Sequence, residues 1–281
     1  MGYHYVPQYY LKGFSESNGD LLWVYEKGAG HKFNTHIKNI GNIAKFYSPE
    51  VEQYLANTIE GPANNILDVI RNRHKISEDD KKIFGEYMAV MWKRVPRGKE
   101  RFKEMAPSIS QKLSEELNRD LDIIASQEPA KATLIERRKT EIKEILDKYA
   151  EDPPEKIWLT NIPPERSSRV VAAIRSMNWT FLTFDEKPAF LTCDNPIFYF
   201  TGIGVGNPES EITFPISSNI VLWATWRNDL PQDYIQTNIK VVKEINRRTA
   251  HNASRYVFHG RDEHWIEPFI KKHSWQLHRL I

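Results

Sequence analysis

The residues best suited to chemistry are few, polar and set in unusual local surroundings. His4 and Gln8 lie in the aromatic, proline-stiffened segment His4-Tyr5-Val6-Pro7-Gln8 near the N-terminus. The imidazole could act as a general acid or base or bind a metal ion, and the Gln8 amide could support a substrate. The alternative is a histidine that hydrogen-bonds a buried carbonyl group and so fixes a docked terminus.

Two carboxylates stand out from the many surface acids. Glu60 follows Glu52 by eight positions on a predicted helix, nearly on the same face, and itself lies in the apolar register. Asp194 comes at the end of a predicted strand and is followed by Asn195 and Pro196. Each acid could be a metal ligand or a catalytic base. Glu60 could equally be half of a buried ion pair, and Asp194 could form an Asx-turn that caps its strand.

A group of arginines surrounds a proline in the middle of the chain. Arg94, Arg97 and Arg101 recur at helical spacing, and three guanidinium groups on one face can clamp a phosphate. The alternative is a solvated face on which they pair with Glu100 and Glu104. Both interpretations stay open because the proline disturbs the register.

The remaining polar candidates are Asn246 and Arg255, along and just after a predicted helix near the C-terminus. They could join one polar network with the residues above. The alternative is helix-terminal hydrogen bonding, since the negative end of the helix dipole favours a cation. The single cysteine, Cys193, is more typical of packing than of a nucleophile.

Taken together, a histidine, one or two carboxylates and Arg and Asn donors match phosphodiester hydrolysis or transesterification. The leading hypothesis is a nuclease, acting on RNA rather than DNA, in a bacterial defence or toxin setting. A divalent cation such as magnesium or manganese would have His4, Glu60 and Asp194 as candidate ligands. The runner-up is a non-catalytic binding or sensing module for a small anionic ligand or nucleic acid, and a third interpretation is a wholly structural polar network.

Composition limits these hypotheses. The 39 Lys and Arg against 37 Asp and Glu give a net charge of +2, which does not support a protein that wraps a polyanion. One cysteine excludes an intrachain disulfide and favours a reducing, cytoplasmic setting. No apolar run is long enough to span a membrane, and no signal peptide, P-loop, dinucleotide fingerprint or paired-cysteine zinc motif is present.

These residues must be positioned by an α+β fold. The predicted strands are 21–25, 44–47, 179–184, 189–192, 211–214, 220–226 and 256–258, and the predicted helices are 50–72, 77–95, 165–177, 235–254 and 263–273. Residues 97–150 predict a charged helical hairpin with its corner at Pro129, and Pro96 should kink or end the preceding helix. We therefore expect a single domain over 1–281, with a helical subdomain over 78–150. This helix-rich middle is inserted between β-forming N- and C-terminal parts that share a small mixed or antiparallel sheet.

The opening motif and the later Asp194-Asn195-Pro196, in this order and at this separation, resemble the family catalogued as domain of unknown function 4238. The resemblance covers nearly the whole chain. Members usually have Thr-Ser before Asp-Asn-Pro, whereas Cys193 replaces the serine here, which argues against an essential Ser or Cys nucleophile. The family brings no established activity, but the resemblance implies one site built from both ends of the chain. The matching positions are His4, Pro7, Gln8, Glu60, Arg94, Pro96, Arg97, Asp194, Asn195, Pro196 and Asn246.

Overall fold

The structure is a computed structural model that describes residues 2–16, 20–187, 189–271 and 276–280, without the side chains of 166–168. It divides into two compact units, one formed by Met1–Pro96 with Pro163–Ile281 and the other by Arg97–Ile162. The architecture is α+β, as predicted: helices from the middle of the sequence separate strands from its two ends. No helix among the described residues is both long and apolar enough to cross a lipid bilayer.

The larger unit is built around a five-stranded mixed sheet. Its strands, in order across the sheet, are β10 (Tyr234–Gln236), β5 (Asn178–Thr183), β9 (Ile220–Thr225), β8 (Glu211–Ser217) and β7 (Phe198–Tyr199). β10 pairs with β5 in parallel, and the other neighbours are antiparallel. All residues of β5, β8 and β9 are buried, which shows that both faces of this sheet are covered.

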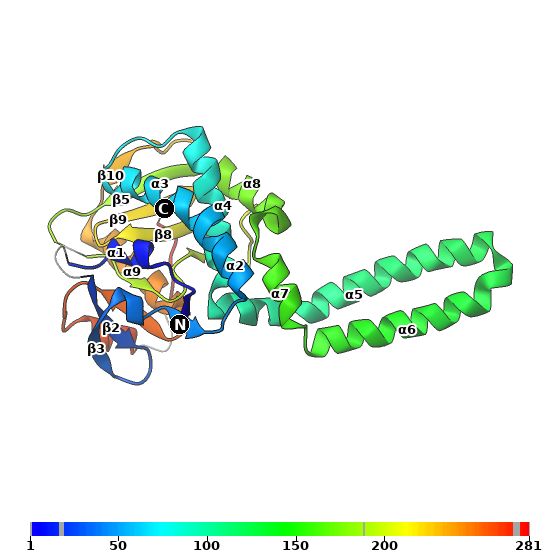
Figure 1. Cartoon of the computed structure of the whole chain (residues 1–281). Coiled ribbons are helices and arrows are strands. Elements are labelled where there is room, and N and C mark those ends of the chain that lie inside the picture. Colours follow the sequence, from blue (N-terminus) through cyan, green and yellow to red (C-terminus); the bar gives the residue numbers. More distant parts are fainter. Residues whose placement is uncertain (1, 17–19, 188, 272–275, 281) are drawn as a thin grey trace. The chain divides into compact units, whose positions relative to one another are not determined.

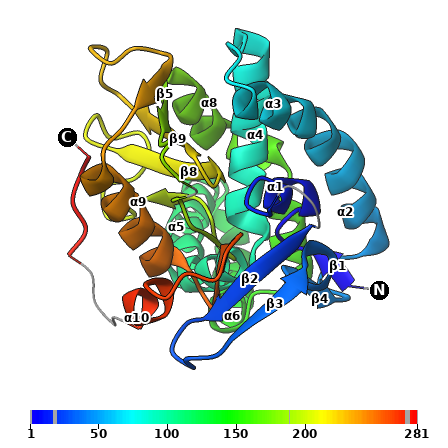
Figure 2. The same ribbon diagram turned by 90° about the vertical axis from the view of Figure 1, so that its left-hand side faces the viewer.

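Helices cover the two faces of the five-stranded sheet (Figure 2). They are α3 (Gly61–Arg71), α4 (Glu78–Arg94) and α8 (Ser168–Ser176) on one side, and α9 (Ile239–Asn252) on the other. Phe84 of α4 packs against the Trp179 and Phe214 rings, with centroids 6.1 and 6.0 Å away. On the opposite face, Leu182 and Val221 pack with Ile245 of α9. Alternate residues of β5 therefore belong to different cores.

A second sheet joins the two ends of the sequence. Its antiparallel order is β3 (Lys32–His36), β2 (Leu21–Glu26), β11 (Tyr256–His259) and β6 (Thr192–Cys193). The prediction that N- and C-terminal parts share a sheet is confirmed by the β2–β11 pairing. A separate two-stranded sheet pairs β1 (Gly2–His4) with β4 (Asn42–Ala44).

Capping residues fix where the central helices begin. The Ser48 hydroxyl accepts from Val51 N–H and begins α2 (Pro49–Tyr54), which continues through a π-helical stretch, Leu55–Glu60, into α3. Ser77 and Asp80 form a capping box that begins α4. Val95 is extended after α4, and Pro96 begins α5, so the predicted break at this proline is confirmed.

The smaller unit is an antiparallel helical hairpin, α5 (Pro96–Gln127) and α6 (Ala132–Glu151), followed by α7 (Glu155–Asn161) (Figure 1). The corner is a 3-10 turn, Pro129–Lys131, as the proline predicted. Ser110 Oγ donates to the Leu146 carbonyl across the hairpin at 2.7 Å.

Four predicted elements differ from the structure. Of the strand predicted over 189–192, only Thr192 lies in a strand, β6. The side chain of Asn246 in α9 binds the backbone of Ala189 and Leu191, where a neighbouring strand would otherwise pair. The first residues of the helix predicted over 235–254 belong to β10, since Asn238 caps α9. The strand predicted over 44–47 ends at Ala44, where β4 ends. The helix predicted over 263–273 is shorter, Ile266–Ile270, and 272–273 lie outside the described residues.

Candidate functional site

The N-terminal segment is docked, as its aromatic content predicted. The Tyr10 hydroxyl, in α1 (Gln8–Lys12), donates to the Pro215 carbonyl at 2.8 Å and lies 2.6 Å from Thr192 Oγ1. Gly13 follows α1, and a Cβ atom there would lie 2.6 Å from the Ile216 carbonyl oxygen. The absence of a side chain therefore permits this close approach. The segment reaches the strand that precedes Asp194, while Gln8 itself is exposed.

Arg94 is the centre of a polar cluster that we call the Arg94 cluster: His4, Tyr47, Glu52, Glu60 and Arg94. The side chain of Arg94 is 1% exposed, and its Nη1 donates to Glu60 Oε1 at 2.5 Å. Its Nη2 donates to the backbone carbonyl of His4, and the guanidinium lies 5.7 Å from the Tyr47 ring centroid. The Tyr47 hydroxyl in turn donates to the Arg94 carbonyl. This cluster fixes β1 to the end of α4.

The charges of the Arg94 cluster depend on one another. Burial opposes the charged form of Arg94, but Glu60 and Tyr47 outweigh it and hold the pKa of Arg94 above its ordinary value. Burial and the nearby Glu60 raise the pKa of Glu52, against the opposing effect of Arg94. Burial lowers the pKa of His4, whose Nε2 lies 3.2 Å from the Lys38 carbonyl. His4 is therefore a neutral imidazole at pH 7.

The π-helical stretch places the two carboxylates. Glu52 lies in α2 and Glu60 ends the π-helical stretch, and both interact electrostatically with Arg94, as expected for acids on one side of a helix. Glu52 Oε2 is buried and accepts no hydrogen bond from the part of the chain that is described. π-helical turns frequently mark functional positions. In this one, Glu60 forms the ion pair that was the alternative interpretation from sequence, but Arg94 is its buried half, since Glu60 is 21% exposed.

Arg97 does not continue the face that Arg94 occupies. It lies in the hairpin unit, beyond the helix break at Pro96, and pairs with Glu104 at 2.6 Å and Glu100 at 3.1 Å. This is the solvated pairing that the sequence left open. The helical spacing of the arginines therefore does not create a phosphate clamp on one continuous helix.

Asp194 caps the turn between α9 and β11. Its carboxylate accepts the backbone N–H groups of Ser254, Arg255 and Tyr256 at 2.8, 2.7 and 3.0 Å. Burial raises the pKa of Asp194 to about 6, while these three donors and Lys27 oppose the shift. The carboxylate thus takes the place of backbone acceptors for these three N–H groups. It caps a turn that is distant in sequence, whereas the alternative interpretation from sequence was a cap on its own strand.

The remaining candidates have structural partners. Asn195 Nδ2 donates to the Asn252 carbonyl at 2.9 Å. Asn246 Oδ1 accepts Leu191 N–H at 3.0 Å, and its Nδ2 donates to the Ala189 carbonyl at 2.8 Å. The exposed Arg255 pairs through Nε with Glu26 at 2.8 Å. These amides bind α9 to the chain segment before and after β6.

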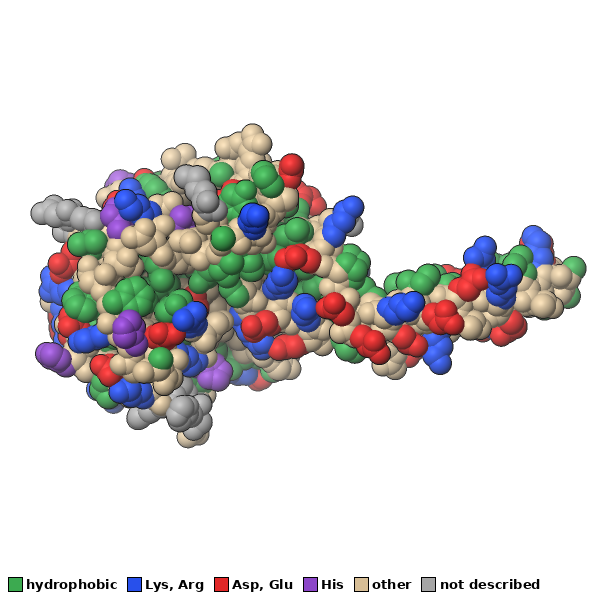
Figure 3. Space-filling view, turned by 60° about the horizontal axis from the view of Figure 1, so that its bottom comes forward, with side chains coloured by type: hydrophobic (Ala, Val, Ile, Leu, Met, Phe, Trp, Pro, Cys, Tyr) green, Lys and Arg blue, Asp and Glu red, His purple; other side chains and the backbone are tan. Residues whose placement is uncertain are grey.

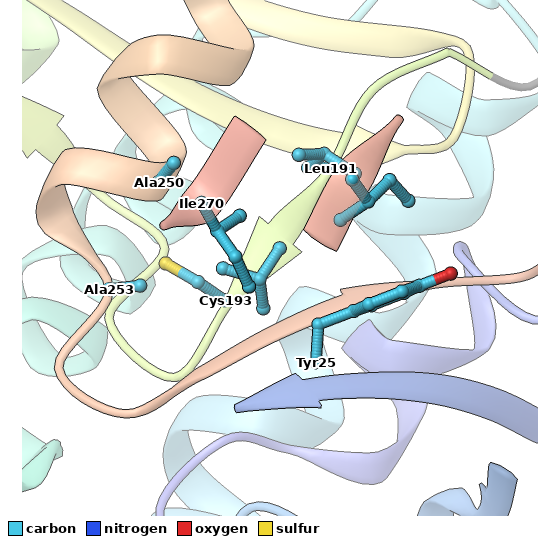
Figure 4. Packing of buried hydrophobic residues seen from close by; sticks show 8 residues of the cluster. Tyr25, Leu191, Cys193, Ala250, Ala253 and Ile270 are labelled. Atoms are coloured by element: carbon cyan, nitrogen blue, oxygen red, sulfur yellow. The ribbon is translucent and has the colours of Figure 1, made fainter. Parts of the chain in front are cut away.

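Cys193 is buried in a hydrophobic cluster with Tyr25, Leu191, Ala250 and Ile270 (Figure 4). Burial raises the pKa of its thiol well above the ordinary value. The thiol is therefore a packing group and not an activated nucleophile, in agreement with the interpretation from sequence.

The structure thus brings together His4, Glu60 and Arg94, and separately Asp194, Asn195 and the Arg255 backbone. Tyr5 connects the two groups, since its buried phenol interacts electrostatically with Asp194 and follows His4 in sequence. Throughout the described ranges, no three His, Cys, Asp or Glu side chains are grouped to hold a metal ion, so His4, Glu60 and Asp194 do not form one metal site.

Sequence reasoning missed a pocket of about 520 Å³ at the edge of the five-stranded sheet. It is enclosed by the α3–α4 connection, the first turn of α4, β5 and β10. We call it the aromatic pocket, and the lining residues used below are Arg73, Lys75, Glu78, Lys81, Trp179, Phe181, Asp233 and Tyr234.

Aromatic rings and a buried cation define the aromatic pocket. Phe181 and Tyr234 stack with centroids 4.9 Å apart and planes at 19°. The Lys81 ammonium lies 5.5 Å from the Trp179 ring centroid and donates to the Met177 carbonyl at 2.8 Å. Burial lowers the pKa of Lys81. The sequence features at this site, aromatics alternating on one strand and a lysine in the apolar register of a helix, are also those of an ordinary buried core.

Comparison with known proteins adds a family and no activity. Neither the curated proteins nor the solved structures gave a match to this chain. A family model described as protein of unknown function, DUF4238, matches residues 3–263. The chain therefore belongs to the DUF4238 family.

Proposed function

We propose that the protein binds a small anion with a flat aromatic ring, of the nucleotide class, in the aromatic pocket. The observation that supports this proposal is the combination of aromatic rings with cations in one concavity of ligand-binding size. Tyr234 provides most of the accessible ring surface, since Trp179 and Phe181 line the pocket but are only 2% and 4% exposed. Lys75 and Lys81 provide positive charge. Base stacking and charge attraction are the two interactions that a nucleotide requires.

The charges of the pocket favour a small ligand over a polymer. Arg73 is neutralised by Asp185, to which Nη1 donates at 3.0 Å, so the exposed Lys75 is the cation available for a phosphate at the rim. Glu78 and Asp233 also line the pocket and could accept hydrogen bonds from base amino or ribose hydroxyl groups. A mixed rim of this kind, on a chain of net charge +2, does not favour a long polyanion.

The nuclease hypothesis stays a prediction that the geometry favours less. Its phosphate clamp, Arg94, is buried and already donates to Glu60 and to the His4 carbonyl. Its second acid, Asp194, is bound by three backbone N–H groups. A transition-state donor must point at the reacting phosphate, and both groups are used within the fold.

Binding would be measured by isothermal titration calorimetry on the full chain. The ligands are the four ribonucleoside 5′-monophosphates, the corresponding nucleosides, inorganic phosphate and a short single-stranded RNA. We expect a monophosphate to bind more tightly than its nucleoside or phosphate alone. Tyr234→Leu should weaken binding roughly tenfold through the lost stacking surface, and Lys75→Ala should remove the advantage of the phosphate. Lys243→Ala, an exposed lysine on α9, is the matched control.

Two results would contradict the proposal: no heat with any monophosphate, or equal affinity in the wild type and both pocket variants. The same protein would be incubated with single-stranded RNA, tRNA and DNA, with and without magnesium or manganese. Cleavage that is lost in a folded His4→Ala or Arg94→Lys variant would restore the nuclease hypothesis and displace the binding module.

A further inference from the structure

Three charged side chains form a buried group between β8 and α9. In the view of Figure 3, charged side chains of both signs are mixed over the surface. By contrast, the side chains of Glu211 in β8 and Arg248 in α9 are 4% and 0% exposed and pair at 2.8 Å, and that of Glu244 is 8% exposed. We call these three residues the Glu–Arg group. Buried charges must be hydrogen-bonded, and further partners of this group lie in residues 276–280, which we call the tail segment.

The Glu–Arg group binds the main chain of the tail segment, which runs beside α9 (Figure 2). Glu244 Oε1 accepts the His278 N–H at 2.8 Å, and Arg248 Nη2 donates to the carbonyl of the same residue. Glu211 Oε1 accepts the Leu280 N–H at 3.2 Å. Main-chain groups of residues two apart point to the same side of an extended chain, so this is the pattern by which one edge of such a chain is bound.

The side chains of the tail segment add little to this recognition. None of the five is buried. The exposed Arg279 pairs with Glu209 at 2.8 Å, and the half-buried Leu280 packs against the core around Val221 and Ile245. Binding through the main chain accepts many sequences, so the sequence requirement is limited to a basic residue followed by an apolar one.

The tail segment leaves part of its binding site unsatisfied. Arg248 Nε and Nη1 are buried and make no hydrogen bond within the described ranges. A hollow of about 240 Å³ lies beside Arg279 and is lined also by Ser210, Glu211 and Thr225. The Ser210 hydroxyl is buried and has no hydrogen-bond partner in the described part of the chain. Buried polar groups are normally satisfied, so these atoms indicate a ligand that makes more polar contacts than the tail segment does.

We propose that the Glu–Arg group and the adjoining hollow bind an extended peptide segment of another protein, in which a basic residue precedes an apolar one. The tail segment occupies the same site as an internal competitor. Without Arg279, Glu209 at the rim would lack its counter-ion, which favours a basic ligand. Among the described residues, the hollow and the aromatic pocket have no lining residue in common, so the peptide and the nucleotide would occupy different sites.

The tail segment can be displaced by a different peptide more readily than by a copy of itself. It is neither helix nor strand and buries no side chain, so it can open at a small fraction of the free energy of global unfolding. A tethered segment has an effective concentration in the millimolar range. The same segment of a second copy therefore competes poorly, and a successful ligand must add contacts to Arg248 or Ser210.

Fluorescence anisotropy on the full chain tests this proposal with a labelled, C-terminally amidated peptide of the tail sequence, Gln-Leu-His-Arg-Leu. His278→Pro removes the N–H that Glu244 accepts, whereas His278→Ala removes the same exposed side chain and keeps that N–H. We expect the peptide to bind His278→Pro about tenfold or more tightly than His278→Ala or the wild type, because the competing tail has lost a hydrogen bond to a charged group. Arg279→Glu, which repels Glu209 and leaves the main chain unchanged, should show the same gain.

Two further measurements test what the site recognises. The peptide with an N-methylated final leucine lacks the N–H that Glu211 would accept, and it should bind His278→Pro about tenfold more weakly. A phage-displayed library of random peptides, selected on His278→Pro, should enrich a basic residue followed by an apolar one. The enriched peptides should also bind the wild type more tightly than the tail peptide does.

Three outcomes would overturn the proposal. The first is a tail peptide that binds neither His278→Pro nor Arg279→Glu, although circular dichroism shows both to be folded, or that binds them no better than His278→Ala. The second is undiminished binding of the N-methylated peptide, which would show that the main chain is not recognised. The third is a selected library without the basic–apolar pair, or one whose peptides bind the wild type no better than the tail peptide.

Discussion

Replacing Arg94 should lower the stability of the fold itself, whether or not the protein catalyses a reaction. Arg94→Met leaves the Glu60 carboxylate without its counterion and removes the donor to the His4 carbonyl. Removing one partner of a fully buried pair costs about 3–5 kcal/mol. The Glu60 side chain is 21% exposed, so water can partly solvate it, and the lower end of that range, about 3 kcal/mol, applies.

Arg94→Lys separates charge from geometry. A lysine keeps the positive charge near Glu60, but its single ammonium cannot reproduce the two-directional fork that also reaches the His4 carbonyl. Losing one hydrogen bond to a charged group costs about 2 kcal/mol. Combining Arg94→Met with Glu60→Gln removes both charges, and the double variant should recover about 1 kcal/mol or more relative to Arg94→Met alone.

Urea unfolding followed by far-ultraviolet circular dichroism would give these free energies. Amide hydrogen exchange should show faster opening of β1 and β4 in Arg94→Lys, because that variant releases the His4 carbonyl. Arg137→Met, on the exposed Arg137–Glu141 pair, is the control and should cost under about 0.5 kcal/mol. If Arg94→Met unfolds at the same urea concentration as this control, the Arg94 cluster does not stabilise the fold and the reasoning is refuted.

Two further predictions concern the groups around β6. The pKa of Asp194 is about 6 in the folded chain against an ordinary 3.8, so the folded state holds a proton that the unfolded state has lost between those values. The free energy of unfolding should therefore fall as pH rises from 4 to 6, by up to ~3 kcal/mol. Urea unfolding of Asp194→Asn should lack that decline. If the wild type and this variant have parallel pH profiles of stability, Asp194 is not the group responsible. Asn246→Ala removes two buried hydrogen bonds to the backbone and should lower the free energy of unfolding in urea by about 2–3 kcal/mol. A decrease of less than half of that would mean that water replaces the amide.

Local sequence signals predicted the helix ends well but did not predict which groups the candidate acids contact. Ser77 with its following acids, and Pro96, correctly placed both ends of α4, because caps and prolines act within one helical turn. Glu60 and Asp194 were singled out from sequence as unusual acids, and both have partners within the fold. Their partners, Arg94 and the backbone after α9, are 34 and about 60 positions away, where no local pattern applies. The chemistry of both acids therefore depended on the fold.

The aromatic pocket shows the same limit more strongly. Trp179 and Phe181 have the alternation of an ordinary buried strand, and Lys81 is one lysine among many. The three share a site only because α4 lies over that face of β5 and because β10 adds Tyr234 in register with Phe181. Each segment alone reads as core, so the concavity could not be recognised before the sheet order was known.

The pairing of β2 with β11 has a consequence for how the chain is made on the ribosome. Glu26 pairs with Tyr256, which is translated 230 positions later. At bacterial and eukaryotic elongation rates of ~5–20 residues per second, this takes ~10–50 s. During that time the nascent β2–β3 hairpin offers an open edge and the apolar side chains of Leu22 and Val24 to other chains. The hairpin of α5 and α6, whose contacts are local, can fold meanwhile, so a chaperone that shields β2 would matter most before the last strand emerges.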